Sequence, residues 1–342
     1  MSFKKVIVTG GCGYIGSHTI VDLIQNGFDV VSIDNLSRSN KNSYLGIEEI
    51  TGKTFVQEEV DLTDRAATLQ ALEKHSDAIG VIHFAAYKSV PESTEKPLLY
   101  YKNNMDSLFH LLEGVEKYAI PNFVFSSSCS VYGLVDTLPV TESTEFKEAQ
   151  CAYARTKQHG EDVLQDVTKA TNVNTVILRY FNPVGAHPSA IIGETPIDVP
   201  NNLVPFITQT AIGKREKLTV FGDDYPTRDG SCVRDYIHVC DIAHAHTLAI
   251  QYLIKNEKLT QPEIFNLGTG NGVSVLEAIQ AFEKAAEVKL NYVIGPRRAG
   301  DVIEVYADNT KAKRELGWAL KYNIDEMMLT AWNWEKKMAN ND

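Results

Sequence analysis

Tyr153 and Lys157 are four residues apart in the stretch Tyr153–Ala170, where apolar residues recur at helical spacing. Residues four apart share one face of a helix, so we expect the lysine ammonium about 5 Å from the phenol. At an effective dielectric constant of ~20, this ammonium would favour the phenolate by about 3 kcal/mol and lower the pKa of Tyr153 from its ordinary value near ~10. The pair therefore predicts a base that takes a proton from a substrate hydroxyl while hydride leaves the same carbon.

Three consecutive serines, Ser126–Ser128, close a predicted strand that begins at Asn122. Ser128 precedes Tyr153 by 25 residues, and a hydroxyl at the carboxyl end of a strand can bridge a substrate oxygen and the tyrosine. The tyrosine–lysine spacing also arises by chance, and serines also begin loops. Together with a glycine-rich turn, however, they favour Ser128, Tyr153 and Lys157 as a catalytic set.

The glycine-rich turn is Gly10-Gly11-Cys12-Gly13-Tyr14-Ile15-Gly16, between a predicted strand and a predicted helix. Gly10 permits the tight turn, Gly13 lets the backbone approach a pyrophosphate, and Gly16 lets the helix pack closely on the strand. A turn alone would also favour glycine. Followed by a helix that starts with Tyr14 and Ile15, the motif predicts a dinucleotide cofactor.

Asp34 ends the next predicted strand, 18 residues after Gly16, where a carboxylate can accept both ribose hydroxyls of adenosine. A 2′-phosphate would be repelled there, so NAD is favoured over NADP. Asn35 and Ser39 follow Asp34 and are assigned to the same site. Arg38 argues against the preference for NAD, because an arginine can bind the 2′-phosphate of NADP. We nevertheless interpret it as a solvated loop residue.

Composition excludes several other classes of protein. The 342 residues carry a net charge of −11, which argues against a nucleic-acid groove or an anionic membrane as the main partner. Five cysteines without a CxxC pair favour reduced thiols, and no apolar run is long enough for a membrane span. His244 and His246 point to different faces of a predicted helix, so no metal site is expected. We expect a cytosolic chain.

Short β-branched runs alternate with helical stretches over the first half of the chain. The predicted strands are Lys5–Thr9, Asp29–Ile33, Thr54–Glu58, Gly80–Phe84, Asn122–Ser126 and Asn174–Arg179. The predicted helices are Ile15–Asn26, Asp64–Lys74, Lys96–Tyr118 and Tyr153–Ala170. This alternation predicts an α/β fold of the Rossmann type, a doubly wound parallel sheet with ligands at the carboxyl ends of its strands.

The alternation stops near residue 182, and five prolines make the stretch 182–205 irregular. We therefore expect a cofactor-binding domain over residues 1–182. A smaller α+β substrate-binding domain should follow over residues 183–342, with some segments crossing back.

The GxxGxxG spacing resembles that of the short-chain dehydrogenase/reductase superfamily. Asp61-Leu62, after the third strand, resembles the superfamily's adenine contact, and Phe84-Ala85 lies where the cofactor would rest against the chain. Longer motifs resemble the extended members, and within them the UDP-galactose (UDP-glucose) 4-epimerases. These motifs are TGGCGYIG at Thr9–Gly16, SSSCSVYG at Ser126–Gly133, YARTK at Tyr153–Lys157, RYFNPVGAHP at Arg179–Pro188, NNLVPFI at Asn201–Ile207, VFGDDYPTRDGSCVRDYIHV at Val220–Val239 and RRAGD at Arg297–Asp301.

The resemblance implies further site residues. Lys88, Asn103 and Phe181 would line the cofactor. The nucleotide sugar would be held by Lys88, Ser128, Tyr153, Asn182, Asn202, Leu203, Val220, Phe221, Arg234, Arg298, Asp301 and Val305. Arg234 and Arg298 suit this role because planar guanidinium groups bind phosphate oxygens in pairs.

The resemblance also implies a reaction, the reversible interconversion of UDP-galactose and UDP-glucose through a 4-keto sugar, with NAD retained. Val305 stands where a tyrosine would restrict the sugar pocket, so UDP-N-acetylhexosamines are expected as additional substrates, unless Val305 only packs in the domain core or the gate is Tyr306. A homodimer through the two long helices is also implied.

Three alternatives stay open. A sugar-nucleotide 4,6-dehydratase usually has an Asp-Glu pair after the fifth strand, where this chain has Ser127-Ser128-Cys129. A UDP-glucuronate decarboxylase and a catalytically silent NAD-sensing protein are the others.

Overall fold

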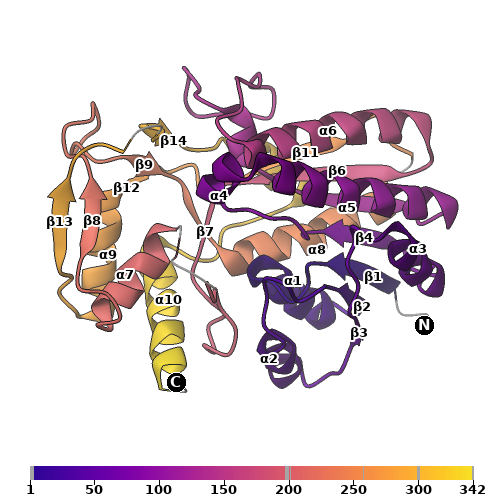
Figure 1. Cartoon of the computed structure of the whole chain (residues 1–342), viewed down its shortest axis with the longest axis horizontal. Coiled ribbons are helices and arrows are strands. Elements are labelled where there is room, and N and C mark those ends of the chain that lie inside the picture. Colours follow the sequence, from indigo (N-terminus) through magenta and orange to yellow (C-terminus); the bar gives the residue numbers. More distant parts are fainter. Residues whose placement is uncertain (1–3, 197–199, 201, 257, 299–300, 341–342) are drawn as a thin grey trace.

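A seven-stranded parallel sheet forms the centre of the larger part of the molecule (Figure 1). The computed structural model describes residues 4–196, 200, 202–256, 258–298 and 301–340; positions 201, 299 and 300 of the motifs quoted above lie outside it. The strand order is β11-β6-β5-β4-β1-β2-β3. The strands are β1 Lys4–Thr9, β2 Phe28–Ile33, β3 Val56–Glu58, β4 Gly80–His83, β5 Asn122–Ser128, β6 Asn174–Tyr180 and β11 Glu263–Leu267.

Helices cover both faces of this sheet because its strands alternate apolar side chains between two cores. Val6 and Val8 of β1 pack with Ile20 and Ile250 on one face, whereas Ile7 belongs to the core of the other. The first face carries α1 Tyr14–Gln25 and α8 Val239–Lys255, with α2 Asn42–Thr51 beside α1. The second carries α3 Arg65–Lys74, α5 Pro97–Lys117 and α6 Ala152–Ala170, with α4 Val90–Glu95 before α5. The predicted Rossmann-type fold is confirmed.

The seventh strand comes from the second half of the chain. β11 pairs with β6 from Glu263–Val176 to Leu267–Tyr180, and α8 packs across α1. The segment 239–267 thus returns to the sheet after the chain has formed β7 to β10. The sequence predicted only six strands.

The remaining elements form a smaller part at the left of Figure 1. Its strands are β7 Asn182–Val184, β8 Leu218–Phe221, β9 Val233–Arg234, β10 Tyr236–His238, β12 Val273–Ser274, β13 Tyr292–Gly295 and β14 Glu304–Val305. Its helices are α7 Leu203–Ala211, α9 Val275–Ala286 and α10 Ile324–Ala339. Ile207, Phe282 and Trp332 share its core. In the described part of the chain, no helix has both the length and the apolar character of a membrane span.

Candidate active site

The glycine-rich turn leaves β1 at Gly10 and enters α1 at Tyr14. Gly10 has a φ of +68°, and a Cβ there would lie 2.7 Å from the backbone nitrogen of Ala85. A Cβ on Gly16 would lie 2.3 Å from the oxygen of Gly10, so helix and strand can approach only because both residues are glycine. The turn presents the amino end of α1, a favourable site for a pyrophosphate, so it fits the predicted dinucleotide.

Asp34 is held at the carboxyl end of β2 by three donors. Its Oδ2 accepts from the backbone nitrogen of Cys12 at 3.0 Å, and its Oδ1 accepts from the nitrogen of Leu36 at 2.8 Å and the Ser39 hydroxyl at 3.0 Å. These bonds fix the carboxylate beside the glycine-rich turn. Its position fits the predicted ribose contact.

Asp61 follows β3 at the same sheet edge and is linked to the Asp34 loop. Its Oδ2 accepts from Asn35 Nδ2 at 3.2 Å, and its Oδ1 accepts from the backbone nitrogen of Thr63 at 2.9 Å. Although burial alone would raise the pKa of Asp61, the Thr63 hydrogen bonds lower it, so this carboxylate is ionised. Leu62 beside it is buried.

Arg38 lies in the loop after β2 and is exposed, as interpreted, but its guanidinium is also engaged by neighbouring side chains. Its guanidinium contacts both carboxylate oxygens of Glu92, at 2.7 and 3.0 Å, and lies 4.1 Å from the centre of the Tyr87 ring. Bidentate pairing and stacking on an aromatic face hold the side chain in place. Arg38 is therefore engaged with the α4 region.

Phe84 and Ala85 continue from β4 directly after His83. The nitrogen of Phe84 donates to the oxygen of Thr9 at 3.0 Å, whereas its ring lies 4.5 Å from that of His246 on α8. The backbone of Phe84 therefore faces the glycine-rich turn, and its ring packs against α8.

The predicted catalytic residues come together at the carboxyl end of β5. Tyr153 lies in the first turn of α6 and Lys157 one turn later, with its Nζ 5.9 Å from the centre of the Tyr153 ring. The same Nζ donates to the backbone oxygen of Ser126 at 2.6 Å. Ser128 ends β5 and hydrogen-bonds Tyr153. One helix face thus brings the phenol and the ammonium to the serine-rich strand end.

The expected lowering of the pKa of Tyr153 is wrong for the protein alone. Burial raises the pKa of this phenol well above its ordinary value, and the nearby Tyr180 adds to the rise, while the Ser128 hydrogen bond opposes it. Burial also lowers the pKa of Lys157 to about 8. Both shifts have one cause, because removal from water disfavours the charged form of each group.

Asn103 and Asn104 lie on α5 beside the same site. Asn103 Nδ2 donates to Asn104 Oδ1 at 3.0 Å, and Asn104 Nδ2 donates to Thr156 Oγ1 on α6 at 3.1 Å. Asn104 also holds Tyr87 through the backbone of that residue. The sequence indicated Asn103 only, and no local pattern distinguishes Asn104.

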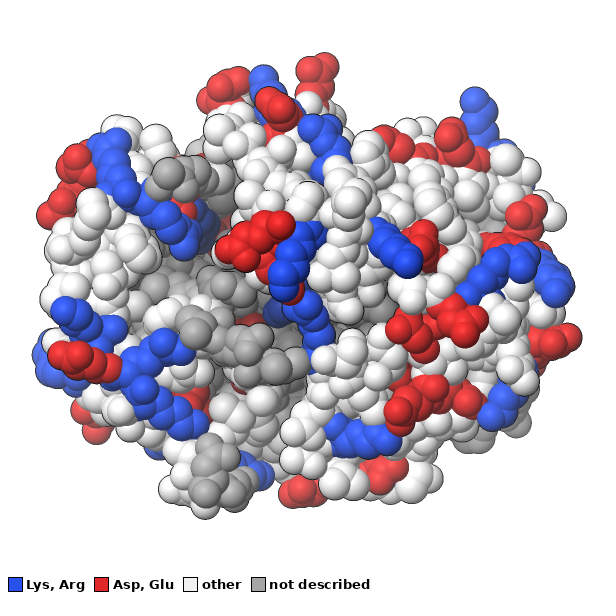
Figure 2. Space-filling view, viewed as in Figure 1, with Lys and Arg blue, Asp and Glu red and all other residues white. Residues whose placement is uncertain are grey.

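Arg234, Arg298 and Asp301 meet in the smaller part of the molecule. Arg298 Nε donates to Asp301 Oδ1 at 3.0 Å, and Arg234 Nη2 lies 4.0 Å from the same oxygen. The Arg298 guanidinium lies 5.4 Å from the centre of the Phe221 ring. Phe221 is exposed, whereas the neighbouring Val220 is buried and turned into the core. In the space-filling view, basic side chains lie around the hollowed centre of this face (Figure 2).

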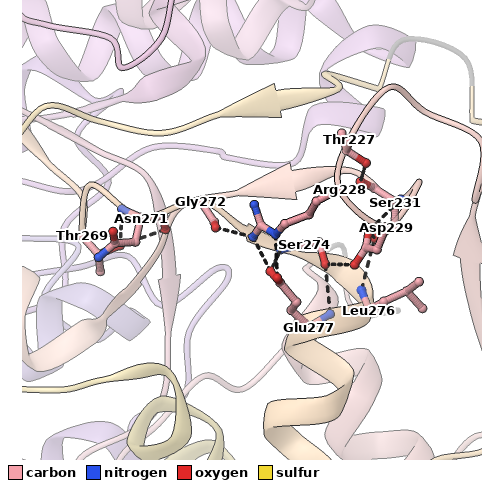
Figure 3. Close-up of polar contacts among 10 residues, drawn as sticks. All are labelled: Thr227, Arg228, Asp229, Ser231, Thr269, Asn271, Gly272, Ser274, Leu276 and Glu277. Atoms are coloured by element: carbon pink, nitrogen blue, oxygen red, sulfur yellow. Dashed lines mark hydrogen bonds and ion pairs between the residues drawn. The ribbon is translucent and has the colours of Figure 1, made fainter.

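The loop before β9 is fixed to the start of α9 (Figure 3). Arg228 pairs through two nitrogens with Glu277 and donates to the oxygen of Gly272 at 2.6 Å. Asp229 accepts from the nitrogen of Ser231 at 3.0 Å and from the hydroxyl of Ser274, the N-cap of α9. These contacts hold the chain that leads into Arg234.

Glu194 contacts two residues that the resemblance implies as ligand-binding residues. Its Oε1 lies 3.2 Å from Lys88 Nζ and accepts from Asn202 Nδ2 at 3.0 Å. Asn202 precedes α7, which begins at Leu203. The carboxylate thus bridges the loop after β4 and the start of α7. No local sequence pattern indicated Glu194.

Val305 on β14 is buried in a cluster with Phe181 and Val131. It is paired in register with Arg234 of β9, and Asn182 begins β7 directly after Phe181. Tyr306 points elsewhere, toward Gly272. Of the two gate candidates, Val305 is therefore the one grouped with residues of the predicted site.

Comparisons with known proteins agree with this geometry. A family model described as GDP-mannose 4,6 dehydratase matches residues 7–330. The chain is 46% identical to UDP-glucose 4-epimerase of Bacillus subtilis, over 98% of both chains. It is 47% identical to UDP-glucose 4-epimerase 2 of Arabidopsis thaliana, over 97% of this chain and 95% of the relative.

Two solved structures extend the comparison. The UDP-glucose 4-epimerase of Stenotrophomonas maltophila with bound NAD and formylated UDP-arabinopyranose is 44% identical, with a TM-score of 0.95 over 99% of this chain and 100% of that chain. The Bifidobacterium longum enzyme in complex with NAD+ and UDP is 42% identical, with a TM-score of 0.93 over the same shares. The chain therefore belongs to the UDP-glucose 4-epimerase family, NAD-dependent isomerases with the extended short-chain dehydrogenase/reductase fold.

Proposed function

We propose that this chain interconverts UDP-galactose and UDP-glucose by redox-neutral inversion at C4, with Ser128, Tyr153 and Lys157 as its catalytic residues. The observation that carries this proposal is the meeting of a half-buried tyrosine, a buried ammonium and a serine hydroxyl at the carboxyl end of β5, beside a turn that fits a dinucleotide. The family relationship supports the same reaction.

Tyr153 takes the proton of the C4 hydroxyl as hydride leaves C4, and it later returns a proton to the C4 oxygen when hydride is delivered to the opposite face of C4. Lys157 favours the phenolate through its charge, and Ser128 bridges the sugar oxygen and the phenol. Bound NAD supplies the hydride acceptor and donor, so no net oxidation occurs. The pKa of Tyr153 is raised by burial even with Lys157 in place, so we infer that the positive charge of bound NAD would add to that of the lysine in favouring the phenolate.

Each part of the molecule has its own ligand in this proposal. Residues 1–182, whose sheet is completed by the returning segment 239–267, hold NAD, and most of the remainder holds UDP. The cofactor residues are Gly10, Gly13, Tyr14, Ile15, Gly16, Asp34, Asn35, Ser39, Asp61, Leu62, Phe84, Ala85, Lys88, Asn103, Tyr153, Lys157 and Phe181.

The nucleotide sugar is held mainly through its UDP. Arg234 and Arg298 bind the pyrophosphate, and their shared partner Asp301 holds the two guanidinium groups near each other. Because UDP anchors the 4-keto sugar, the hexose can turn and present its other face. The remaining contacts come from Lys88, Asn182, Asn202, Leu203, Val220, Phe221 and Val305.

UDP-N-acetylhexosamines are proposed as additional substrates. Val305 occupies a cluster with Phe181, a predicted cofactor contact, and its side chain is smaller than a tyrosine. The freed volume suits a 2-acetamido group. A solved Campylobacter jejuni relative, 35% identical, is described as a UDP-Glc/GlcNAc 4-epimerase.

A homodimer and a cytoplasmic location complete the proposal. Leu98 and Phe109 of α5 are 82% and 46% exposed, so this helix offers apolar surface to a second copy. The helices α5 and α6 of two copies would pair into a four-helix interface. All five cysteines are free, which suits a reducing compartment.

The test is a coupled assay in which UDP-galactose is supplied and UDP-glucose is measured. Conversion in both directions to a common equilibrium supports the proposal. A 4-keto-6-deoxy product would indicate a dehydratase, turnover of UDP-glucuronate alone a decarboxylase, and NAD binding without turnover a silent sensor. Each of these results would overturn the proposed function.

A further inference from the structure

Three successive turns of α6 face the three serines at the end of β5. Tyr153 hydrogen-bonds Ser128, and Lys157 donates to the backbone oxygen of Ser126 at 2.6 Å. One turn further, Glu161 accepts a hydrogen bond from the Ser127 hydroxyl. Residues at i, i+4 and i+8 of a helix share one face, so this third contact continues the catalytic face.

Glu161 is fully buried and forms an ion pair with Arg179 of β6, which is itself buried. Arg179 Nη2 donates to Glu161 Oε2 at 2.6 Å, and its Nε donates to Oε1 at 3.0 Å. Although burial alone would lower the pKa of Arg179, the hydrogen bonds to Glu161 raise it, so Arg179 stays charged. A buried pair of this kind adds little stability over apolar packing, and such pairs are more often retained for positioning.

The pair also reaches the opposite wall of the site. Arg179 Nη1 donates to the Tyr132 hydroxyl at 3.0 Å, and Tyr132 donates to Asn266 Oδ1 at 2.6 Å. Asn266 Nδ2 donates to the oxygen of Val140 at 3.1 Å, and Val140 pairs with the chain just after β14. The hydrogen bonds thus run from α6 to the chain that directly follows Val305.

We propose that Glu161, together with Arg179, is a positioning residue that fixes the Ser126–Ser128 strand end against α6 and sustains the charge of Lys157. This inference rests on the proposed function. Loss of the Ser127 contact loosens the strand end that carries Ser128 and the Ser126 carbonyl. Loss of the Glu161 charge removes the anion that favours the lysine ammonium and leaves Arg179 as an unpaired cation beside it.

Several ionisable groups surround Lys157 and enter its titration. Glu161 favours its ammonium, whereas burial disfavours it. His83 on β4 is neutral, because burial and the charge of Lys157 together lower its pKa to about 3. The other ionisable groups near it are Tyr153 on α6 and Arg179 and Tyr180 on β6.

Two variants test the proposal in the purified holoenzyme. Ser127→Ala removes the contact and keeps the ion pair, so kcat should fall by about tenfold or more with KM for UDP-galactose within about twofold. Its kcat–pH profile should keep its position. Glu161→Gln should lower kcat and move the whole profile to lower pH, because the remaining positive charge favours the phenolate and disfavours the lysine ammonium.

Glu263→Gln is the matched control, because Glu263 forms an ion pair with Lys311 at a distance of 2.8 Å and neither residue lies on α6. This variant should leave kcat and the kcat–pH profile unchanged. If wild-type protein epimerises UDP-galactose while both folded variants keep the wild-type kcat and profile, the positioning role is refuted and the proposed function stands. If Glu161→Gln does not fold, Ser127→Ala alone decides by its kcat. Wild-type protein without activity would refute the proposed function, and this inference with it.

Discussion

Lys157 Nζ donates a 2.6 Å hydrogen bond to the backbone oxygen of Ser126 and lies 5.9 Å from the centre of the Tyr153 ring. Its nearest acceptor is therefore a neutral carbonyl. A neutral partner orients the ammonium without cancelling its charge, so that charge remains available to the phenol. The positive charge of Lys157 can therefore act through space on the phenol oxygen of Tyr153.

Tyr153→Phe removes the proton acceptor and keeps the ring. We expect kcat to fall by ~10²–10⁴ while the protein stays folded and retains NAD. Steady-state kinetics with UDP-galactose measure the loss, and circular dichroism checks the fold. Turnover close to that of wild type in a folded variant would mean that another group acts as the base.

The alkaline limb of the rate profile should report Lys157. Burial lowers the pKa of this lysine to about 8, so the ammonium is charged below that pH and neutral above it. Because only the charged form favours the phenolate, kcat should decline as pH rises through about 8. Lys157→Met should lose this limb together with most of the activity. A kcat that keeps rising to pH 10 contradicts the assigned role.

Arg298→Gln should weaken binding more than chemistry. Arg298 is largely exposed and shares Asp301 with Arg234, so its loss should leave the fold intact. We expect Kd for UDP to rise roughly tenfold, because a charge-assisted contact to phosphate is lost. Calorimetry with UDP measures this change. Arg314→Gln is the control, because Arg314 pairs only with its neighbour Glu315 among the described residues; equal losses in both variants would show that Arg298 does not touch UDP.

Val305→Tyr should narrow the substrate range. The phenol would fill the space beside Phe181, so turnover of UDP-N-acetylgalactosamine should fall at least about tenfold more than that of UDP-galactose. Both sugars are assayed with both proteins. The gate assignment fails if wild type ignores the acetylated sugar or if the variant loses the two activities equally.

Local patterns predicted the elements that carry the chemistry. The turn from β1 into α1 and the face shared by Tyr153 and Lys157 follow from sequence spacing alone, because they depend on neighbours within one or two helical turns. The strand β11 was missed because its five residues join the sheet only by pairing with β6, more than 80 residues earlier.

Long-range packing also explains the other misses. Glu161 contacts Ser127, 34 residues earlier, and Glu194 contacts Lys88, 106 residues earlier, which no local pattern reveals. The pKa of Tyr153 was predicted from its lysine alone, whereas burial beside Tyr180 sets its direction. Burial is a property of the assembled fold.

The most direct test of redox-neutral epimerisation uses protein purified without added nucleotide. The cofactor released on denaturation is quantified, and UDP-galactose is then supplied to the untreated protein. The account predicts close to one NAD(H) per chain and full conversion to the UDP-glucose equilibrium with no nucleotide added. A cofactor-free protein that turns over only when NADP is supplied would contradict both the retained cofactor and the role of Asp34.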